Sequence, residues 1–120
     1  AQYIDRPVPD RDGSSTAAVR AWAVKHLDET LTLQDLARQA STSVRTLTRR
    51  FRQETGMTPM HWLGQQRLQY ARQLLERTDE SVDRVAAAAG FGTGTAMRQH
   101  FREALGVSPR AYRNTFRGTQ

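Results

Sequence analysis

The sequence predicts an all-α fold of about seven helices, in which two helix-turn-helix subdomains are joined by a long linker helix. The first observation is an internal repeat: residues 51–59 (FRQETGMTP) recur fifty positions later as residues 101–109 (FREALGVSP). The second is that capping residues and glycines separate short stretches whose apolar residues fall at helical spacing. The third is that no stretch shows the period of two that marks a strand. Together these observations indicate a duplicated helical unit.

The first copy of this unit contains three predicted helices. Ser14 or Ser15 caps the first, whose apolar stripe consists of Val19, Trp22, Ala23, His26 and Leu27. Thr32 caps a short second helix, and its buried face consists of Leu33, Leu36, Ala37 and Ala40. Ser43 caps the third helix, which runs from residue 44 to about residue 55 and ends before a glycine.

A long helix is expected between the two copies. Thr58 and Pro59 form an N-cap and a first helical residue, and the helix continues to about residue 77, a length of about 28 Å. The chain therefore divides into four parts: a linker or tail (1–13), a first helix-turn-helix subdomain (14–56), the linker helix (57–78) and a second helix-turn-helix subdomain (79–120).

The second copy again contains three predicted helices. Ser81 caps a helix over residues 82–89, and Thr93 opens one that continues to about residue 105. Ser108 and Pro109 begin the last helix, which ends near residue 116. The glycine-rich turn between the first two (GFG, 90–92) follows a helix rather than a strand and lacks a phosphate-binding Gly-Lys-Ser/Thr ending, so a nucleotide site is not expected there.

Composition favours a basic, cysteine-free domain. The chain of 120 residues has a net charge of +6 and a pI near 11.0, and Lys25 is its only lysine among 18 basic residues. Arginine offers a planar fork that suits phosphates and guanine edges. The absence of cysteine excludes disulfides, and no apolar run is long enough to span a membrane. A cytoplasmic location without membrane attachment is the expectation, because no signal-peptide pattern opens the sequence.

The third and sixth predicted helices each combine an apolar face with an opposite polar face. In residues 44–55 the apolar face consists of Val44, Leu47 and Phe51, and the polar face of Arg45, Arg49 and Arg52 with Thr48 at its edge. In residues 94–105 the apolar face consists of Met97, Phe101 and Leu105, and the polar face of Thr95, Gln99 and Arg102 with Arg98 beside them. These polar groups bond base edges or phosphates, and neither face has an acid at its centre. Both helices are therefore predicted to read DNA.

Several of these segments resemble the DNA-binding domain of AraC/XylS-type transcription regulators. The resemblance is carried by residues 51–59, by Arg67-Leu68 and Ala71 in the long helix, by Val85-Ala86, by residues 90–92 and by residues 101–112. It implies that two helix-turn-helix subdomains place their reading helices, 44–55 and 94–105, in successive major-groove segments of double-stranded DNA. It also implies an effector or dimerisation domain upstream of residue 1 and a contact with RNA polymerase.

The resemblance assigns base contacts by position. They fall on Arg45, Thr48 and Arg49 in the first subdomain and on Thr95, Ala96 and Gln99 in the second. Since an alanine replaces the polar residue common in the family, the second subdomain is expected to specify fewer bases and to rely more on the DNA backbone. Candidate backbone contacts are Arg52, Arg98, Arg102 and Arg110.

Other functions have less support. The alternative is a helical protein-interaction module without sequence-specific DNA binding, in which the arginines serve solubility. RNA binding lacks the exposed aromatics on a sheet that single-stranded RNA modules use. No nucleophile–base, carboxylate-pair or metal-ligand constellation is present, so neither an enzyme nor a metal or other cofactor is expected. Arg67 lies on an apolar stripe, and its burial predicts a carbonyl or acidic partner, with Asp35, Glu76 and Asp79 as the candidate acids.

Overall fold

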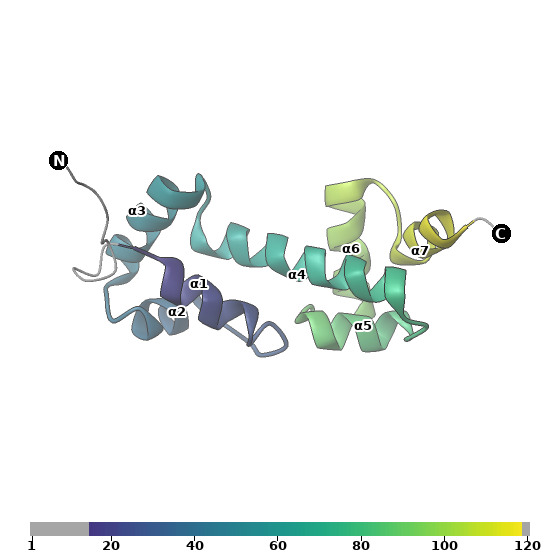
Figure 1. Cartoon of the computed structure of the whole chain (residues 1–120), viewed down its shortest axis with the longest axis horizontal. Helices are drawn as coiled ribbons and strands as arrows, with labels where there is room; N and C mark the ends of the chain where they lie inside the picture. The colour runs from purple at the N-terminus through teal and green to yellow at the C-terminus, as the bar shows by residue number, and fades with distance from the viewer. Residues whose placement is uncertain (1–14, 119–120) are drawn as a thin grey trace. The chain divides into compact units, whose positions relative to one another are not determined.

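Seven α-helices make up the computed structural model over residues 15–118, the part of the chain that it describes (Figure 1). They are α1 (Ala17–Val24), α2 (Leu33–Gln39), α3 (Val44–Thr55), α4 (Pro59–Arg77), α5 (Val82–Ala89), α6 (Gly94–Leu105) and α7 (Pro109–Arg117). The predicted all-α class is confirmed. The expected tail over residues 1–13 lies outside the described residues. None of the helices in residues 15–118 is long and apolar enough to cross a membrane.

Helix capping follows the sequence except at α1. Thr32, Ser43, Ser81, Thr93 and Ser108 each accept a main-chain N–H from the first turn of their own helix, as expected. The expectation that Ser14 or Ser15 caps the first helix is wrong for Ser15, because the N-cap is Thr16; Ser14 lies outside the described residues. Ser15 instead accepts the N–H of Ala17 at 3.0 Å.

The ends of α3 and α6 show the same local structure fifty residues apart. Gly56 has φ of 79° and Gly106 has φ of 76°, and each N–H bonds to a carbonyl one turn back, on Arg52 and Arg102 respectively. Glycine adopts this left-handed conformation without a steric penalty. The chain then turns sharply into α4 and α7, which both begin with proline.

The chain forms two compact units. The first contains α1, α2, α3 and residues 59–63 of α4; the second contains residues 27–30, the remainder of α4, and α5 to α7. In the first unit, α2 packs against α1 and α3. Its fully buried side chains include Leu36, Leu47, Phe51 and Leu63.

The second unit has a matching core. Leu68, Ala71 and Leu75 of α4 pack with α5 and α6 through a cluster completed by Val85, Ala86, Ala89, Met97 and Phe101. Phe91 from the glycine-rich turn packs against this cluster, as expected for a core residue. Each unit therefore buries the apolar face of one reading helix and leaves its opposite face in solvent.

In the second unit, Arg67 bonds main-chain carbonyls of residues 27–30. Arg67 on α4 donates from Nε to the Leu27 carbonyl at 3.2 Å and from Nη2 to the Glu29 carbonyl at 2.7 Å. Of the predicted alternatives, the carbonyl partner is therefore correct, and the candidate acids Asp35, Glu76 and Asp79 are wrong. Burial lowers the pKa of Arg67, and two carbonyl acceptors offset the cost of burying the guanidinium.

Candidate nucleic-acid interface

The first candidate reading helix, α3, presents its arginines to solvent. Leu47 and Phe51 are buried, and Phe51 packs edge-on against Trp62 with ring centroids 5.6 Å apart. On the opposite face Arg45, Arg49 and Arg52 are exposed, and Thr48 is half-buried. Among residues 15–118 the side chains of these three arginines have no hydrogen-bond or ion-pair partner, so their guanidinium donors are available to a ligand. The structure thus brings the predicted site residues of the first subdomain together on one face.

The second candidate reading helix, α6, has the same scaffold and a different polar face. Met97 and Phe101 are buried, and Phe101 packs edge-on against Tyr112 at 5.9 Å. Thr95, Gln99 and Arg102 are exposed on the opposite side, and Ala96 is half-buried beside them. The predicted residues of the second subdomain are therefore also on one face.

The polar groups of α6 bond to one another. Arg98 donates from Nη2 to the Thr95 hydroxyl at 3.2 Å, and the Gln99 amide donates to Glu103 Oε2 at 3.3 Å. Glu103 places a carboxylate at the edge of this face, where the corresponding residue of α3 is Gln53. The α6 face is consequently less positive and more internally satisfied than the α3 face.

The start of α6 depends on a close approach to α5. Gly94 is buried, and a Cβ atom built on it would lie 2.3 Å from Asp83 Oδ1 and 3.2 Å from Arg98 Nη1. Only glycine lets Asp83 come so near the first turn of α6. Thr93 caps the same turn by accepting the N–H of Ala96.

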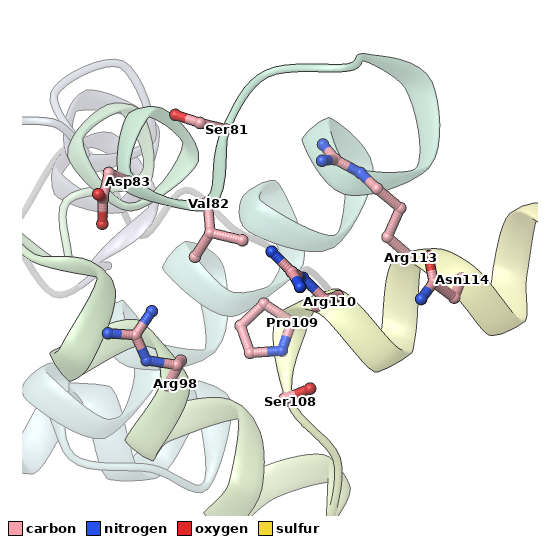
Figure 2. Close-up of a pocket in the computed structure, with 9 residues that line it drawn as sticks. All are labelled: Ser81, Val82, Asp83, Arg98, Ser108, Pro109, Arg110, Arg113 and Asn114. Carbon is pink, nitrogen blue, oxygen red and sulfur yellow. The ribbon is translucent and has the colours of Figure 1, made fainter.

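A pocket of about 850 Å³ lies in the second unit, beside α6. It is lined by residues at the starts of α5 and α7 together with Arg98 of α6: Ser81, Val82, Asp83, Arg98, Ser108, Pro109, Arg110, Arg113 and Asn114 (Figure 2). Helix N-termini present N–H groups and a partial positive charge to an anion. Asp83 is the only acid in this lining, against three arginines.

The arginines of this pocket are not equivalent. Arg110 is exposed and has no hydrogen-bond or ion-pair partner within the described residues. Arg113 extends toward the end of α4 (Figure 2), where Nε donates to the Leu75 carbonyl at 3.1 Å and Nη2 to the Thr78 carbonyl at 3.0 Å. Arg113 is therefore held by the end of α4, whereas the Arg98 side chain bonds only the Thr95 hydroxyl and the Arg110 side chain bonds no described residue.

Two groups of residues near the candidate interface were not expected from the sequence. One is the pair Arg113 and Arg117, which both donate to the Thr78 carbonyl between α4 and α5. The repeat could have predicted the role of Arg117, since this residue stands fifty positions after Arg67 and likewise donates to a main-chain carbonyl. The other is Glu54, which accepts hydrogen bonds from Thr16 at the start of α1. No periodicity or motif links residues 16 and 54.

Comparison with known proteins assigns the family. A helix-turn-helix domain model matches residues 36–115. The transcriptional activator RhaS of Klebsiella pneumoniae is 40% identical over 93 residues, which cover 78% of this chain and 34% of RhaS. The chain thus spans about a third of the length of the curated relatives it matches.

Solved structures agree with this assignment. The DNA-binding domain of the global transcriptional factor AdpA, determined with a target DNA, is 49% identical with a TM-score of 0.82, covering 85% of this chain and 92% of that one. The C-terminal domain of AraT, a response regulator from Geobacillus stearothermophilus, is 32% identical with a TM-score of 0.79, covering 83% and 84%. With both reading helices, their caps and the repeated core in place, the chain belongs to the AraC/XylS-type family of helix-turn-helix DNA-binding domains.

Proposed function

We propose that this chain binds double-stranded DNA sequence-specifically as part of a transcription regulator, with α3 and α6 lying in successive major-groove segments. The observation that carries the proposal is the pair of solvent-facing polar faces at matching positions of the repeat, each opposite a buried apolar face. An α-helix fits the major groove, and successive major-groove segments on one side of DNA are about 34 Å apart. The AdpA domain, which was solved with its target DNA, supports the same reading.

Base reading falls on six positions in this proposal. Arg45 and Arg49 are one helical turn apart on α3, and each fork can donate to O6 and N7 of a guanine, with Thr48 between them. On α6 the proposed base-reading residues are Thr95, Ala96 and Gln99, of which Thr95 and Gln99 stand fifty positions after Arg45 and Arg49. Since Ala96 has no polar atom beyond Cβ and Gln99 is already bonded to Glu103, the α3 half-site is expected to be the more strongly specified.

Contacts to the DNA backbone fall on Arg52, Arg98, Arg102 and Arg110. The pocket beside α6 supports two of them, since Arg98 and Arg110 line it together with the first turns of α5 and α7. A phosphate there would meet arginine donors and main-chain N–H groups at once. The positions of the first copy that correspond to Arg98 and Arg110 are Thr48 and Met60, so this arrangement is specific to the second unit.

The experiment that tests the proposal is selection of bound duplexes from a random DNA pool. We expect two unlike half-sites, with guanines in the one read by α3, and an affinity that falls steeply with salt. Binding without sequence preference would overturn the proposal and favour the alternative, a helical protein-interaction module. Scrambled duplexes of the same length and composition, measured at the same salt concentration, provide the control.

The wider regulatory role is proposed on the family resemblance. RhaS is a transcriptional activator, and this chain matches about a third of it. We infer that the chain acts with an effector or dimerisation domain encoded upstream of residue 1 and that it contacts RNA polymerase. A reporter driven by the selected site, assayed with the full gene product and with this chain alone, tests both parts.

A further inference from the structure

A single carboxylate in the first unit joins α1 to the reading helix α3. Glu54 Oε1 accepts the main-chain N–H of Thr16 at 2.8 Å and the Thr16 hydroxyl at 2.6 Å. Arg20 completes the cluster: its Nη2 lies 3.4 Å from Glu54 Oε1, and its Nε donates to the Thr16 hydroxyl oxygen at 2.9 Å. Thr16 is only 1% exposed, so this Thr16–Glu54 cluster is shielded from water on one side.

The cluster takes the place of an ordinary helix cap. Thr16 is the N-cap of α1, yet its side chain makes no capping bond to its own helix. The N-caps of α2, α3, α5, α6 and α7 all make that bond. The Thr16 hydroxyl instead donates to Glu54 of α3 and accepts from Arg20 Nε, so both of its roles are used within the cluster.

Glu54 holds α3 from the side opposite its reading face. It follows Arg45 by nine residues, which corresponds to a rotation of about 180° around an α-helix. It therefore cannot reach a base that Arg45 contacts. Leu47 and Phe51 bury the same side of the helix, but apolar contacts are non-directional, whereas hydrogen bonds weaken steeply when misaligned. The carboxylate adds the directional restraint that the core lacks.

The restraint matters because base reading demands accurate aim. A rotation of α3 by about 20° would move a group on its surface by about 2 Å, given the radius of a helix with its side chains. A bidentate contact between arginine and guanine does not survive a shift of that size. The second copy has no equivalent restraint, since the residue fifty positions after Glu54 is Ala104.

We infer that Glu54 is a positioning residue for sequence recognition: with Thr16 and Arg20 it fixes the rotation of α3 about its axis and so aims Arg45 and Arg49 at the bases. The inference rests on the proposed function, because it concerns how the first half-site is read. Neither Glu54 nor Thr16 contacts DNA in this proposal, and Thr16 is buried.

The test uses the full chain and the duplex selected from the random pool, compared with duplexes that carry one base change in either half-site. We expect Thr16→Val, which removes the hydroxyl and leaves α3 unchanged, to lower discrimination at the α3 half-site by about tenfold, as loss of a charge-assisted hydrogen bond would. Discrimination at the α6 half-site should stay constant. Thr16→Ser keeps the hydroxyl and should restore discrimination to the level of the unchanged protein.

A second pair of variants controls for charge. Glu54→Gln and Glu103→Gln each remove one negative charge from a reading helix, so both should raise non-specific affinity equally. Only Glu54→Gln should reduce discrimination at the α3 half-site. Unchanged discrimination in both Thr16→Val and Glu54→Gln would overturn the inference.

The fraction of folded protein, measured by circular dichroism under the binding conditions, excludes a purely structural effect. An equal loss at both half-sites that matches a loss of folded protein would show a stabilising role only and would overturn the inference. If the unchanged protein itself shows no sequence preference, the proposed function fails and the inference with it. The two outcomes that overturn only the inference leave the sequence preference of the unchanged protein intact, so they can be distinguished from failure of the proposed function.

Discussion

The two units of this chain share their packing and differ in their exposed chemistry. Phe51 meets Trp62 at an interplanar angle of 66°, and Phe101 meets Tyr112 at 73°, with centroid distances within a few tenths of an ångström. The exposed faces differ, since the side chains of Arg45, Arg49 and Arg52 on α3 have no bonding partner among residues 15–118, whereas the polar groups of α6 bond to one another. The scaffold constrains the buried residues because close packing tolerates little change, whereas the solvent-facing residues are free to diverge.

The surroundings of the reading helices differ as well. In the first unit a carboxylate bonded to α1 restrains α3, and in the second unit an arginine-lined pocket adjoins α6. We propose that the first unit reads bases more accurately and that the second unit depends more on contacts to the DNA backbone.

The largest effect is expected from the shared core. Phe51→Ala and Phe101→Ala each leave a cavity beneath a reading helix and should lower the free energy of unfolding by about 3–5 kcal/mol. Urea denaturation measures the change. Since the two phenylalanines are equally buried, unequal costs that differ by more than a factor of two would contradict the equivalence of the cores.

The reading faces should respond unequally to truncation. Arg49→Ala should cost about 1–3 kcal/mol of discrimination at one or two positions of the α3 half-site. Gln99→Ala should cost less in the α6 half-site, because Gln99 already spends one donor on Glu103. Binding to single-base variants of the selected duplex tests this order. A uniform loss across all duplexes for Arg49→Ala would make that residue a phosphate contact.

The pocket predicts a difference in salt dependence. Arg110→Ala should weaken binding to all duplexes alike and reduce the slope of log affinity against log salt by about 0.9. Met60 is the exposed counterpart of Arg110 in the first unit, so Met60→Arg should raise the slope instead. Arg77→Ala, which removes an exposed arginine at the end of α4, serves as the matched control. If Arg77→Ala and Arg110→Ala changed the slope equally, the proposal that the pocket holds a DNA phosphate would be contradicted.

The smallest effect is expected at the helix caps. Thr32→Ala breaks a reciprocal capping box with Asp35 and should lower the free energy of unfolding by about 1–2 kcal/mol. Ser81→Ala breaks a single capping bond and should lower it by about 1 kcal/mol. Main-chain and side-chain hydrogen bonds from Thr32, together with Arg38, hold the pKa of Asp35 below 3.8. A lowered folded-state pKa gives stability that is present above 3.8 and is lost as pH falls through the lower value.

Acid titration of unfolding therefore checks the capping box. The difference in the free energy of unfolding between the unchanged protein and Thr32→Ala should become smaller below about pH 4, because Asp35 is then protonated. Ser81→Ala has no such carboxylate partner at its cap, so its cost should stay constant over the same range. A constant cost for Thr32→Ala as well would show that Asp35 adds nothing to the cap.

Local signals in the sequence predict most of this fold. Polar N-caps, glycine C-caps and prolines at first helical positions mark at least one end of six helices, α2 to α7, because these residues satisfy or avoid main-chain groups within one turn. The prediction is wrong at α1, where Thr16 bonds to a residue 38 positions away. The expected subdomain boundaries (14–56, 57–78 and 79–120) stay predictions, since compactness instead divides α4 between two units.

The sequence predicts which residues share the exposed face of each candidate reading helix, but it does not predict the hydrogen bonds between their side chains. The period of a helix places Arg45 and Arg49 opposite Leu47 and Phe51 from sequence alone. The bond between Gln99 and Glu103 depends on rotamers, and the Thr16–Glu54 cluster depends on how α1 packs on α3. Neither follows from spacing, because each side chain has several low-energy conformations until tertiary contacts select one.

Arg67 has a practical consequence for chimeric regulators. Residues 27–30 precede α2 in the chain, yet they belong to the compact unit that contains α5 to α7, and Arg67 bonds two of their carbonyls. The addition of a Cβ at Gly90 would place that atom 1.9 Å from the Leu27 carbonyl oxygen, so the fit there is also tight. A graft that exchanges the second half of this chain with that of a relative must therefore carry residues 27–30 along. A junction placed at the boundary of the sequence repeat would instead leave residues 27–30 of this chain to pack against the relative's residues at the positions of Arg67 and Gly90.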